Sequence, residues 1–138
     1  MKEKVYLSGP LFSRAEIEWC NQIKADILES LGDRAEVIWP HEIAAGSPEE
    51  IFQSNLKALG ECKIMVAILD GPQVDDGTSW EMGYHYARGG KIVGIRTDFR
   101  KAGEAAESKV NLMIEGSCLI IVNSLVLLLS SLKEILES

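Results

Sequence analysis

The chain contains 138 residues, a length that fits one domain with a single hydrophobic core. Hydrophobic residues make up 46% of it, and 21 acidic against 14 basic residues give a formal net charge of -7. This acidic balance argues against binding of polymeric nucleic acid, for which a basic face is expected. A single nucleoside or nucleotide is not excluded, because local contacts can outweigh the overall charge.

The cysteines and the apolar stretches exclude further classes of protein. Cys20, Cys62 and Cys118 are odd in number and far apart, so we expect buried, reduced thiols rather than a disulfide framework or a zinc site. The chain starts Met-Lys-Glu-Lys without an apolar signal region, and its most apolar stretch, residues 118–129, is too short to span a bilayer. We therefore expect a cytoplasmic protein that has no membrane segment.

Short apolar runs alternate with helical patterns along the chain, which is typical of a parallel sheet covered by helices. The first helix carries apolar residues at spacings of three and four, and Gly32 follows as its C-terminal cap. The second begins with Ser47 as N-cap, Pro48 at its first position and Glu50 completing a capping box. In chain order we expect strand 4–8, helix 13–31, strand 36–39, the helix after Ser47, strand 63–69, helix 77–90, strand 91–95, helix 104–114, strand 118–122 and helix 124–136.

This order predicts one α/β domain over residues 1–138, with a doubly wound, five-stranded parallel sheet. Residues 64–69 are apolar at every position, as expected for a strand buried on both faces. In such sheets ligands bind outside the carboxyl ends of the strands, where the strand order reverses. For a flavodoxin-like order that point lies between the first and third strands, so we expect the site at residues 8–12 and 70–77.

The segment 70–83 carries the richest set of polar side chains, and two interpretations of it are open. Thr78-Ser-Trp-Glu81 fits a capping box, in which Glu81 only satisfies a backbone N–H, and Asp75 and Asp76 fit ordinary turn residues. In the other interpretation these acids are catalytic, because glycosidic cleavage with retention needs one ionised carboxylate and one protonated acid. The first turn of a helix would then keep Glu81 ionised through the helix dipole, and a neighbouring aspartate would hold its proton longer.

Four residues outside this segment are further candidates. Asn55 falls on the apolar face of the second helix, where a buried amide needs a partner, either at the sheet edge or in a ligand. Gly9 permits close approach of a ligand to the backbone, although no phosphate-binding fingerprint is present. The hydroxyl of Tyr6 could reach the same cleft or pack in the core. His85 has no further His or Cys near it, so we expect no metal site.

Five segments in chain order carry a resemblance to a known family. They are VYLSGPLF at 5–12, IMVAILDGP at 64–72, DDGTSWEMGY at 75–84, GIRTDFR at 94–100 and VNLMI at 110–114. Together they resemble the nucleoside 2-deoxyribosyltransferase family over about residues 4–122. The resemblance implies a flavodoxin-like fold and transfer of 2-deoxyribose between the nucleobases of 2′-deoxynucleosides, without a metal or organic cofactor.

The resemblance also implies roles for individual residues. Glu81 matches the family nucleophile, which forms a covalent deoxyribosyl-enzyme intermediate, and Asp75 matches the aspartate that contacts the base and handles its proton. Tyr6 matches a tyrosine that helps orient the nucleophile. Asn111 and Met113 match residues that a neighbouring subunit lends to the sugar site, so we expect a homo-oligomer with a shared active site.

The matching segments add Gly9, Phe12 and Asp76 as expected substrate contacts. Asn55 departs from the family pattern, because many members carry there an aspartate that binds the sugar hydroxyls or assists with protons. An amide can still bind the sugar but cannot act as an acid or base, which makes Asp75 the expected proton donor.

Two other functions compete with deoxyribosyl transfer. The first is hydrolysis of a 2′-deoxynucleoside or its 5′-monophosphate, for which Arg96, Arg100 and Lys109 are candidate phosphate ligands. The second is a non-catalytic nucleotide-sensing module, which Asn55 favours and the complete pair of Asp75 and Glu81 disfavours. The expected partners are a deoxynucleoside and a free nucleobase.

Overall fold

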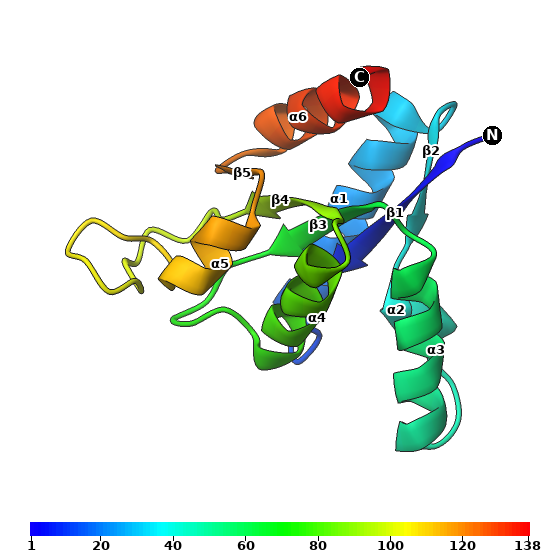
Figure 1. Cartoon of the computed structure of the whole chain (residues 1–138), viewed down its shortest axis with the longest axis horizontal. Coiled ribbons are helices and arrows are strands. Elements are labelled where there is room, and N and C mark those ends of the chain that lie inside the picture. The colour runs from blue at the N-terminus through cyan, green and yellow to red at the C-terminus, as the bar shows by residue number, and fades with distance from the viewer.

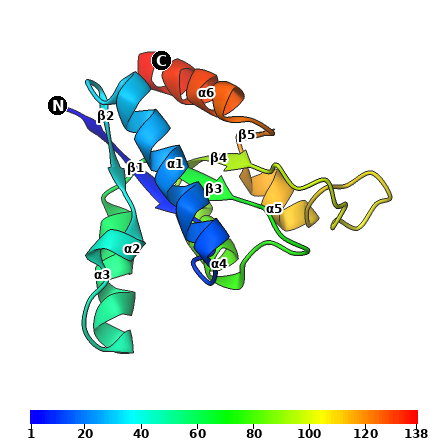
Figure 2. The same ribbon diagram turned by 180° about the vertical axis from the view of Figure 1, so that it is seen from behind.

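The computed structural model describes residues 1–138 and shows a five-stranded parallel sheet with helices on both faces (Figures 1 and 2). The strands are β1 (Glu3–Ser8), β2 (Ala35–Ile38), β3 (Ile64–Ile68), β4 (Lys91–Ile95) and β5 (Ile120–Val122), in the order β2-β1-β3-β4-β5. The helices are α1 (Arg14–Leu31), α2 (Pro40–Ile43), α3 (Pro48–Gly60), α4 (Asp76–Ala87), α5 (Leu112–Ser117) and α6 (Leu125–Glu137). The predicted flavodoxin-like, doubly wound sheet is confirmed.

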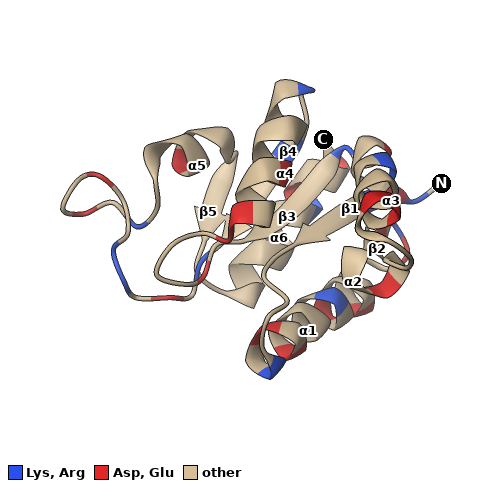
Figure 3. Ribbon diagram, turned by 90° about the horizontal axis from the view of Figure 1, so that it is seen from below, with Lys and Arg blue, Asp and Glu red and all other residues tan.

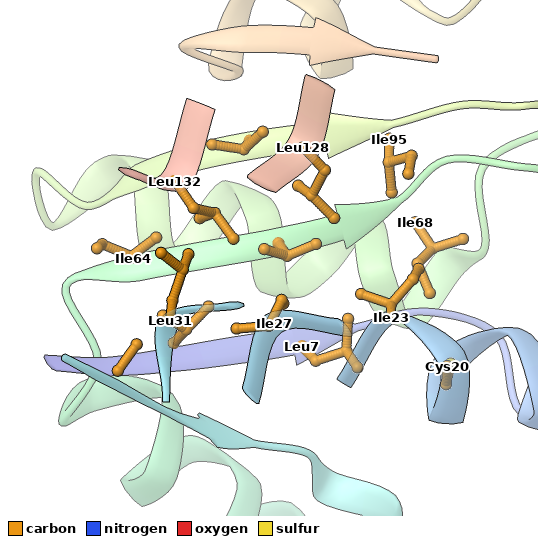
Figure 4. Close-up of a cluster of buried hydrophobic side chains, with 14 of the residues drawn as sticks. Leu7, Cys20, Ile23, Ile27, Leu31, Ile64, Ile68, Ile95, Leu128 and Leu132 are labelled. Carbon is orange, nitrogen blue, oxygen red and sulfur yellow. The ribbon is translucent and has the colours of Figure 1, made fainter. Parts of the chain in front are cut away.

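Side chains of the central strands alternate between two buried clusters, one on each face of the sheet. Val5 and Leu7 of β1 join the cluster beneath α1 and α6, part of which is drawn in Figure 4. Tyr6, between them, joins the cluster that Leu59 of α3 and Met82 of α4 complete on the other face. Every residue of β3 is buried, as its unbroken apolar run predicted. The alternation matters for the site, because it turns the even-numbered side chains of β1 toward α4.

Most predicted helix starts are confirmed by their caps. Ser13 accepts a hydrogen bond from the Glu16 N–H at 3.2 Å and begins α1. At α3, Ser47 accepts from the Glu50 N–H at 3.2 Å, while the Glu50 carboxylate accepts from the Ser47 N–H at 3.1 Å. This is the predicted capping box. The one-turn helix α2 was not predicted.

The helix predicted at residues 104–114 is wrong. Residues 104–111 form bends and turns, and the loop before α5 extends away from the sheet in Figures 1 and 2. The carboxylate of Glu104 accepts hydrogen bonds from the Leu112 N–H at 2.9 Å and from Asn111 Nδ2 at 3.0 Å. Glu104 thereby satisfies an N–H group at the start of the next helix, where no intrahelical partner exists. The helix begins only at Leu112.

The three cysteines are free thiols, as predicted, with Cys20 and Cys62 buried and Cys118 half-buried. Burial raises the pKa of each thiol to about 11, which keeps the reactive thiolate scarce. No helix combines the length and the apolar character that crossing a membrane requires.

Candidate active site

A cavity of about 400 Å³ opens at the carboxyl end of β1, between α3 and α4. It lies at the edge of the sheet where the sequence placed the site, because the strand order reverses between β1 and β3. In Figure 3 several acidic residues gather near the beginning of α4, while the strands are almost free of charge. The lining residues are Leu7, Ser8, Gly9, Leu11, Phe12, Trp39, Pro40, Phe52, Asn55, Leu56, Leu59, Asp75, Gly77, Trp80 and Glu81.

Glu81 is held by two hydroxyl groups of β1. Ser8 Oγ donates to Glu81 Oε1 at 2.6 Å, and the Tyr6 hydroxyl donates to Glu81 Oε2. Tyr6 and Ser8 are two residues apart on one strand, so their side chains point to the same face and reach the same carboxylate. Both oxygens of Glu81 are thereby fixed in orientation.

Glu81 takes no part in capping α4, so the capping-box interpretation is wrong. The N-cap is Asp75, and Glu81 is the sixth residue of the helix, in its second turn. The expectation that a first-turn position keeps Glu81 ionised is also wrong, since the dipole effect falls off within that turn. Burial instead raises the pKa of Glu81 above its ordinary value of 4.5, opposed by the hydrogen bonds from Ser8 and Tyr6 and reinforced by the charge of Asp75.

Tyr6 is fully buried and serves Glu81 as a neutral donor. Burial, and then the charge of Glu81, raise the pKa of the Tyr6 phenol above its ordinary value of 10.0. The phenol therefore keeps its proton at neutral pH and is available as a donor to Glu81.

Asp75 lines the cavity and also begins α4. Its Oδ2 atom accepts hydrogen bonds from the Thr78 N–H at 3.0 Å and from Thr78 Oγ1 at 3.1 Å. Its Oδ1 atom has no hydrogen bond within the chain, so one oxygen of this carboxylate is free for a ligand. Asp76, by contrast, is exposed, does not line the cavity, and accepts from the Gly77 N–H at 2.8 Å.

Three other expected residues lie at the cavity. Asn55 lines it from α3, and its Oδ1 atom is buried without a hydrogen-bond partner. Phe12 is 83% exposed at the rim. Gly9 lines the cavity too, but the close neighbour that demands a glycine is Ile68, whose Cδ1 atom would lie 2.7 Å from an added Cβ.

The structure adds residues that the sequence did not single out. Ser8 belongs to a segment that the sequence marked, yet a serine carries no signal of its own. Trp39 and Phe52 look like core residues because of their apolar character. Phe52 of α3 and Trp80 of α4 meet edge to face with ring centroids 5.9 Å apart, and Trp80 stacks on Tyr84 at 5.6 Å.

Asn111 and Met113 lie outside the cavity of their own chain. Asn111 caps α5, where its Oδ1 atom accepts from the Met113 N–H at 2.8 Å and its Nδ2 atom donates to Glu104. Met113 is 73% exposed. A role of either residue in a neighbouring subunit's site stays a prediction.

None of the three candidate phosphate ligands lines the cavity. Arg96 is buried and donates to the backbone carbonyls of Leu69, Gly71 and Arg100. Arg100 pairs with Asp98. Lys109 lies beside β5 and α6.

His85 follows Glu81 by one turn of α4 but does not line the cavity. It is buried near the amino ends of β3 and β4, with Nε2 3.2 Å from the carbonyl oxygen of Lys91. No group of three or more His, Cys, Asp or Glu side chains converges as a metal site would require.

We compared the chain with known proteins by structure and by sequence. Among solved structures, a conserved protein from Enterococcus faecalis V583 is similar with a TM-score of 0.84 and 27% identity, covering 97% of this chain and 99% of that one. A 2-deoxyribosyltransferase from Bacillus psychrosaccharolyticus has a TM-score of 0.76 and 24% identity, covering 91% and 90%. A CMP N-glycosidase from Clostridium botulinum has a TM-score of 0.59 and 22% identity, covering 96% and 99%.

The last two likenesses concern the fold alone, and a search of the curated proteins gave no match. The sequence model of the nucleoside 2-deoxyribosyltransferases, however, matches residues 5–113, which is most of the chain and includes Tyr6, Asp75 and Glu81. The chain belongs to the nucleoside 2-deoxyribosyltransferase family.

Proposed function

We propose that the protein transfers 2-deoxyribose between the nucleobases of 2′-deoxynucleosides, with Glu81 as the nucleophile. One observation carries this proposal. The carboxylate of Glu81 lines the cavity at the ligand edge of the sheet, and it is held by Tyr6 and Ser8 rather than used in a helix cap.

In the first step a Glu81 oxygen attacks C1′ of the sugar. The C1′–O bond forms as the C1′–N bond breaks, and the electron pair of the broken bond leaves with the base nitrogen. Burial disfavours the charge on Glu81, so the reactive anion is less stabilised than it is in water. Because a deoxyribose lacks the electron-withdrawing 2′-oxygen, its oxocarbenium-like transition state is easier to reach.

The departing base needs a proton, and we assign its delivery to Asp75. The free Oδ1 atom of Asp75 faces no competing donor within the chain, whereas Oδ2 is committed to Thr78. In the second step another base attacks C1′, the ester to Glu81 breaks, and the N–H proton of the incoming base returns to Asp75. The cycle closes without water and without a cofactor.

Hydrolysis is the alternative, in which water replaces the second base. The apolar and aromatic lining of the cavity, with Phe52 and Trp80 in contact, favours an incoming base. No Lys or Arg lines the cavity, so this chain offers no cation for a 5′-phosphate, and a free deoxynucleoside is the better fit. A silent sensing module would have no need of a buried, oriented carboxylate.

We extend the proposal to a site completed by a second copy of the chain. Met113 is largely exposed and follows Asn111 at the start of α5. Further exposed apolar side chains near β5 and on α6 are Leu119, Ile120, Val126 and Leu127. Such a group of exposed apolar residues is typical of a surface that binds a partner.

The test is incubation of the protein with deoxyinosine, with and without adenine. Transfer predicts deoxyadenosine, and hypoxanthine beyond one equivalent of protein, only when adenine is present. Hydrolysis predicts free deoxyribose in both mixtures, and a sensor predicts no product. Glu81→Ala should abolish the transfer, with Glu134→Ala as control because Glu134 is an exposed carboxylate on α6, outside this cavity. Near-parental transfer by Glu81→Ala would contradict the proposal.

A further inference from the structure

The two oxygens of the Glu81 carboxylate lie in different surroundings. Oε1 accepts a hydrogen bond from Ser8 Oγ at 2.6 Å, and Ser8 is one of the residues that line the cavity. Oε2 accepts from the hydroxyl of Tyr6, which does not line the cavity and packs with Met82 in the buried cluster beside α4. One oxygen is therefore bonded to the wall of the cavity, and the other is bonded to the core of the protein.

Access, rather than hydrogen bonding, decides which oxygen can attack a sugar. A carboxylate oxygen has two lone-pair sites, so one donor at each oxygen of Glu81 leaves a lone pair free on both. Tyr6 is fully buried and approaches Oε2 from the core, whereas Oε1 adjoins a residue of the cavity wall. A sugar bound in the cavity can bring its C1′ to Oε1 without displacing the core around Tyr6.

We infer that Oε1 is the atom of Glu81 that bonds to C1′, and that Ser8 is the residue that positions it. The inference rests on the proposed function. A lone pair of Oε1 forms the C1′–O bond while the electron pair of the C1′–N bond leaves with the base, and Oε2 becomes the carbonyl oxygen of the ester. Tyr6 keeps this carbonyl oxygen as an acceptor. Ser8, by contrast, loses its anionic acceptor, because Oε1 is now uncharged and bonded to two carbons.

The two hydroxyl groups should therefore differ in their effect on the covalent intermediate. The bond from Ser8 stabilises the free carboxylate but not the ester, so it disfavours the intermediate and its removal should make the intermediate more abundant. The bond from Tyr6 is present in both states and is only weaker in the ester, so its removal should have a smaller effect. A residue that merely supports the fold would not raise the amount of intermediate at equilibrium.

The experiment measures the equilibrium between free protein and deoxyribosyl-protein. Each protein is mixed with deoxyinosine and a series of hypoxanthine concentrations at mildly alkaline pH and quenched in acid, and the modified fraction is read by mass spectrometry of the intact chain. We expect Ser8→Ala to raise the equilibrium constant for the intermediate about tenfold. Ser8→Cys should raise it less, because a thiol is a weak donor, and Tyr6→Phe should also raise it less than Ser8→Ala.

Ser117→Ala is the matched control. Its hydroxyl also donates one hydrogen bond, to the carbonyl oxygen of Ile114 at 2.8 Å, but Ser117 lies outside the cavity, so the constant should not change. An unchanged or lowered constant in Ser8→Ala would overturn the inference, and Ser8→Cys decides in the same way if Ser8→Ala does not fold. A larger rise in Tyr6→Phe would identify Oε2 as the attacking atom and would also overturn it.

Failure of the proposed function gives a different result. A parent protein that neither releases hypoxanthine nor gains the mass of the sugar would refute the proposed function, and this inference with it. A parent protein that is modified, with the same constant in Ser8→Ala, would refute the inference alone.

Discussion

Replacing Tyr6 by Phe should move the pH dependence of transfer toward higher pH. The Tyr6 hydroxyl donates to the ionised form of Glu81 and lowers its pKa, which burial has already raised. A hydrogen bond to a charged group contributes about 1.5–3 kcal/mol, and a pKa unit corresponds to about 1.36 kcal/mol. Without this bond the pKa of Glu81 should therefore rise further above its ordinary value. Ser8 still donates to the other oxygen, so the carboxylate keeps one anchor.

The assay is kcat/KM for transfer from deoxyinosine to adenine, measured from acidic to mildly alkaline pH. The acid limb reports ionisation of the nucleophile in the free enzyme, so it should shift upward in Tyr6→Phe and rates should recover at higher pH. Tyr86→Phe is the control, because Tyr86 is 58% exposed and outside the cavity. Unshifted limbs would refute the reasoning, and a uniformly lowered profile would mean that Tyr6 only supports the fold.

Three further changes have defined outcomes. Glu81→Gln should raise the melting temperature at pH 7. Folding raises the pKa of Glu81 above 4.5, so the stability of the parent protein falls as pH rises from 4.5 through the folded-state pKa. The gain should vanish in acid, and a lower melting temperature at pH 7 would contradict this prediction. Asp75→Asn keeps an N-cap but cannot donate a proton to the base, so kcat should fall with little change in melting temperature. Asp75→Ala should in addition lose about 1 kcal/mol of stability. Full activity of Asp75→Asn would mean that the residue is only a cap. Glu81→Ala and Asn111→Ser proteins should each be inactive, and mixing them should restore activity if subunits share their sites. An active monomer in sedimentation at assay concentration would contradict the shared site.

The sequence predicted the fold well because its signals are local. Ser47, Pro48 and Glu50 form the expected capping box, and the unbroken apolar run of β3 is buried throughout. Residues 104–114 misled the prediction because their helix-forming composition competes with a nonlocal contact, in which Glu104 caps the helix that begins at Leu112. Periodicity cannot show a contact of this kind.

The site was predicted in part. Its edge of the sheet followed from the sequence, and the family resemblance implied Glu81 with Tyr6 as the tyrosine that orients it. The hydrogen bond from Ser8 was not predicted, because Ser8 reaches Glu81 across 73 positions of the chain. The tetrapeptide from Thr78 to Glu81 fits a capping box, but Asp75 captures the cap three residues earlier. Competition between two possible caps is decided by tertiary packing, and the sequence pattern alone does not rank them.

The central claim is that Glu81 forms a covalent bond to the sugar. The protein should be mixed with deoxyinosine in the absence of an acceptor base, quenched in acid, digested and analysed by mass spectrometry. We expect the peptide that contains Glu81 to gain the mass of one 2-deoxyribosyl unit, and brief addition of adenine before the quench should remove it. Release of hypoxanthine in amounts equal to the protein, with the peptide unmodified, would contradict the claim.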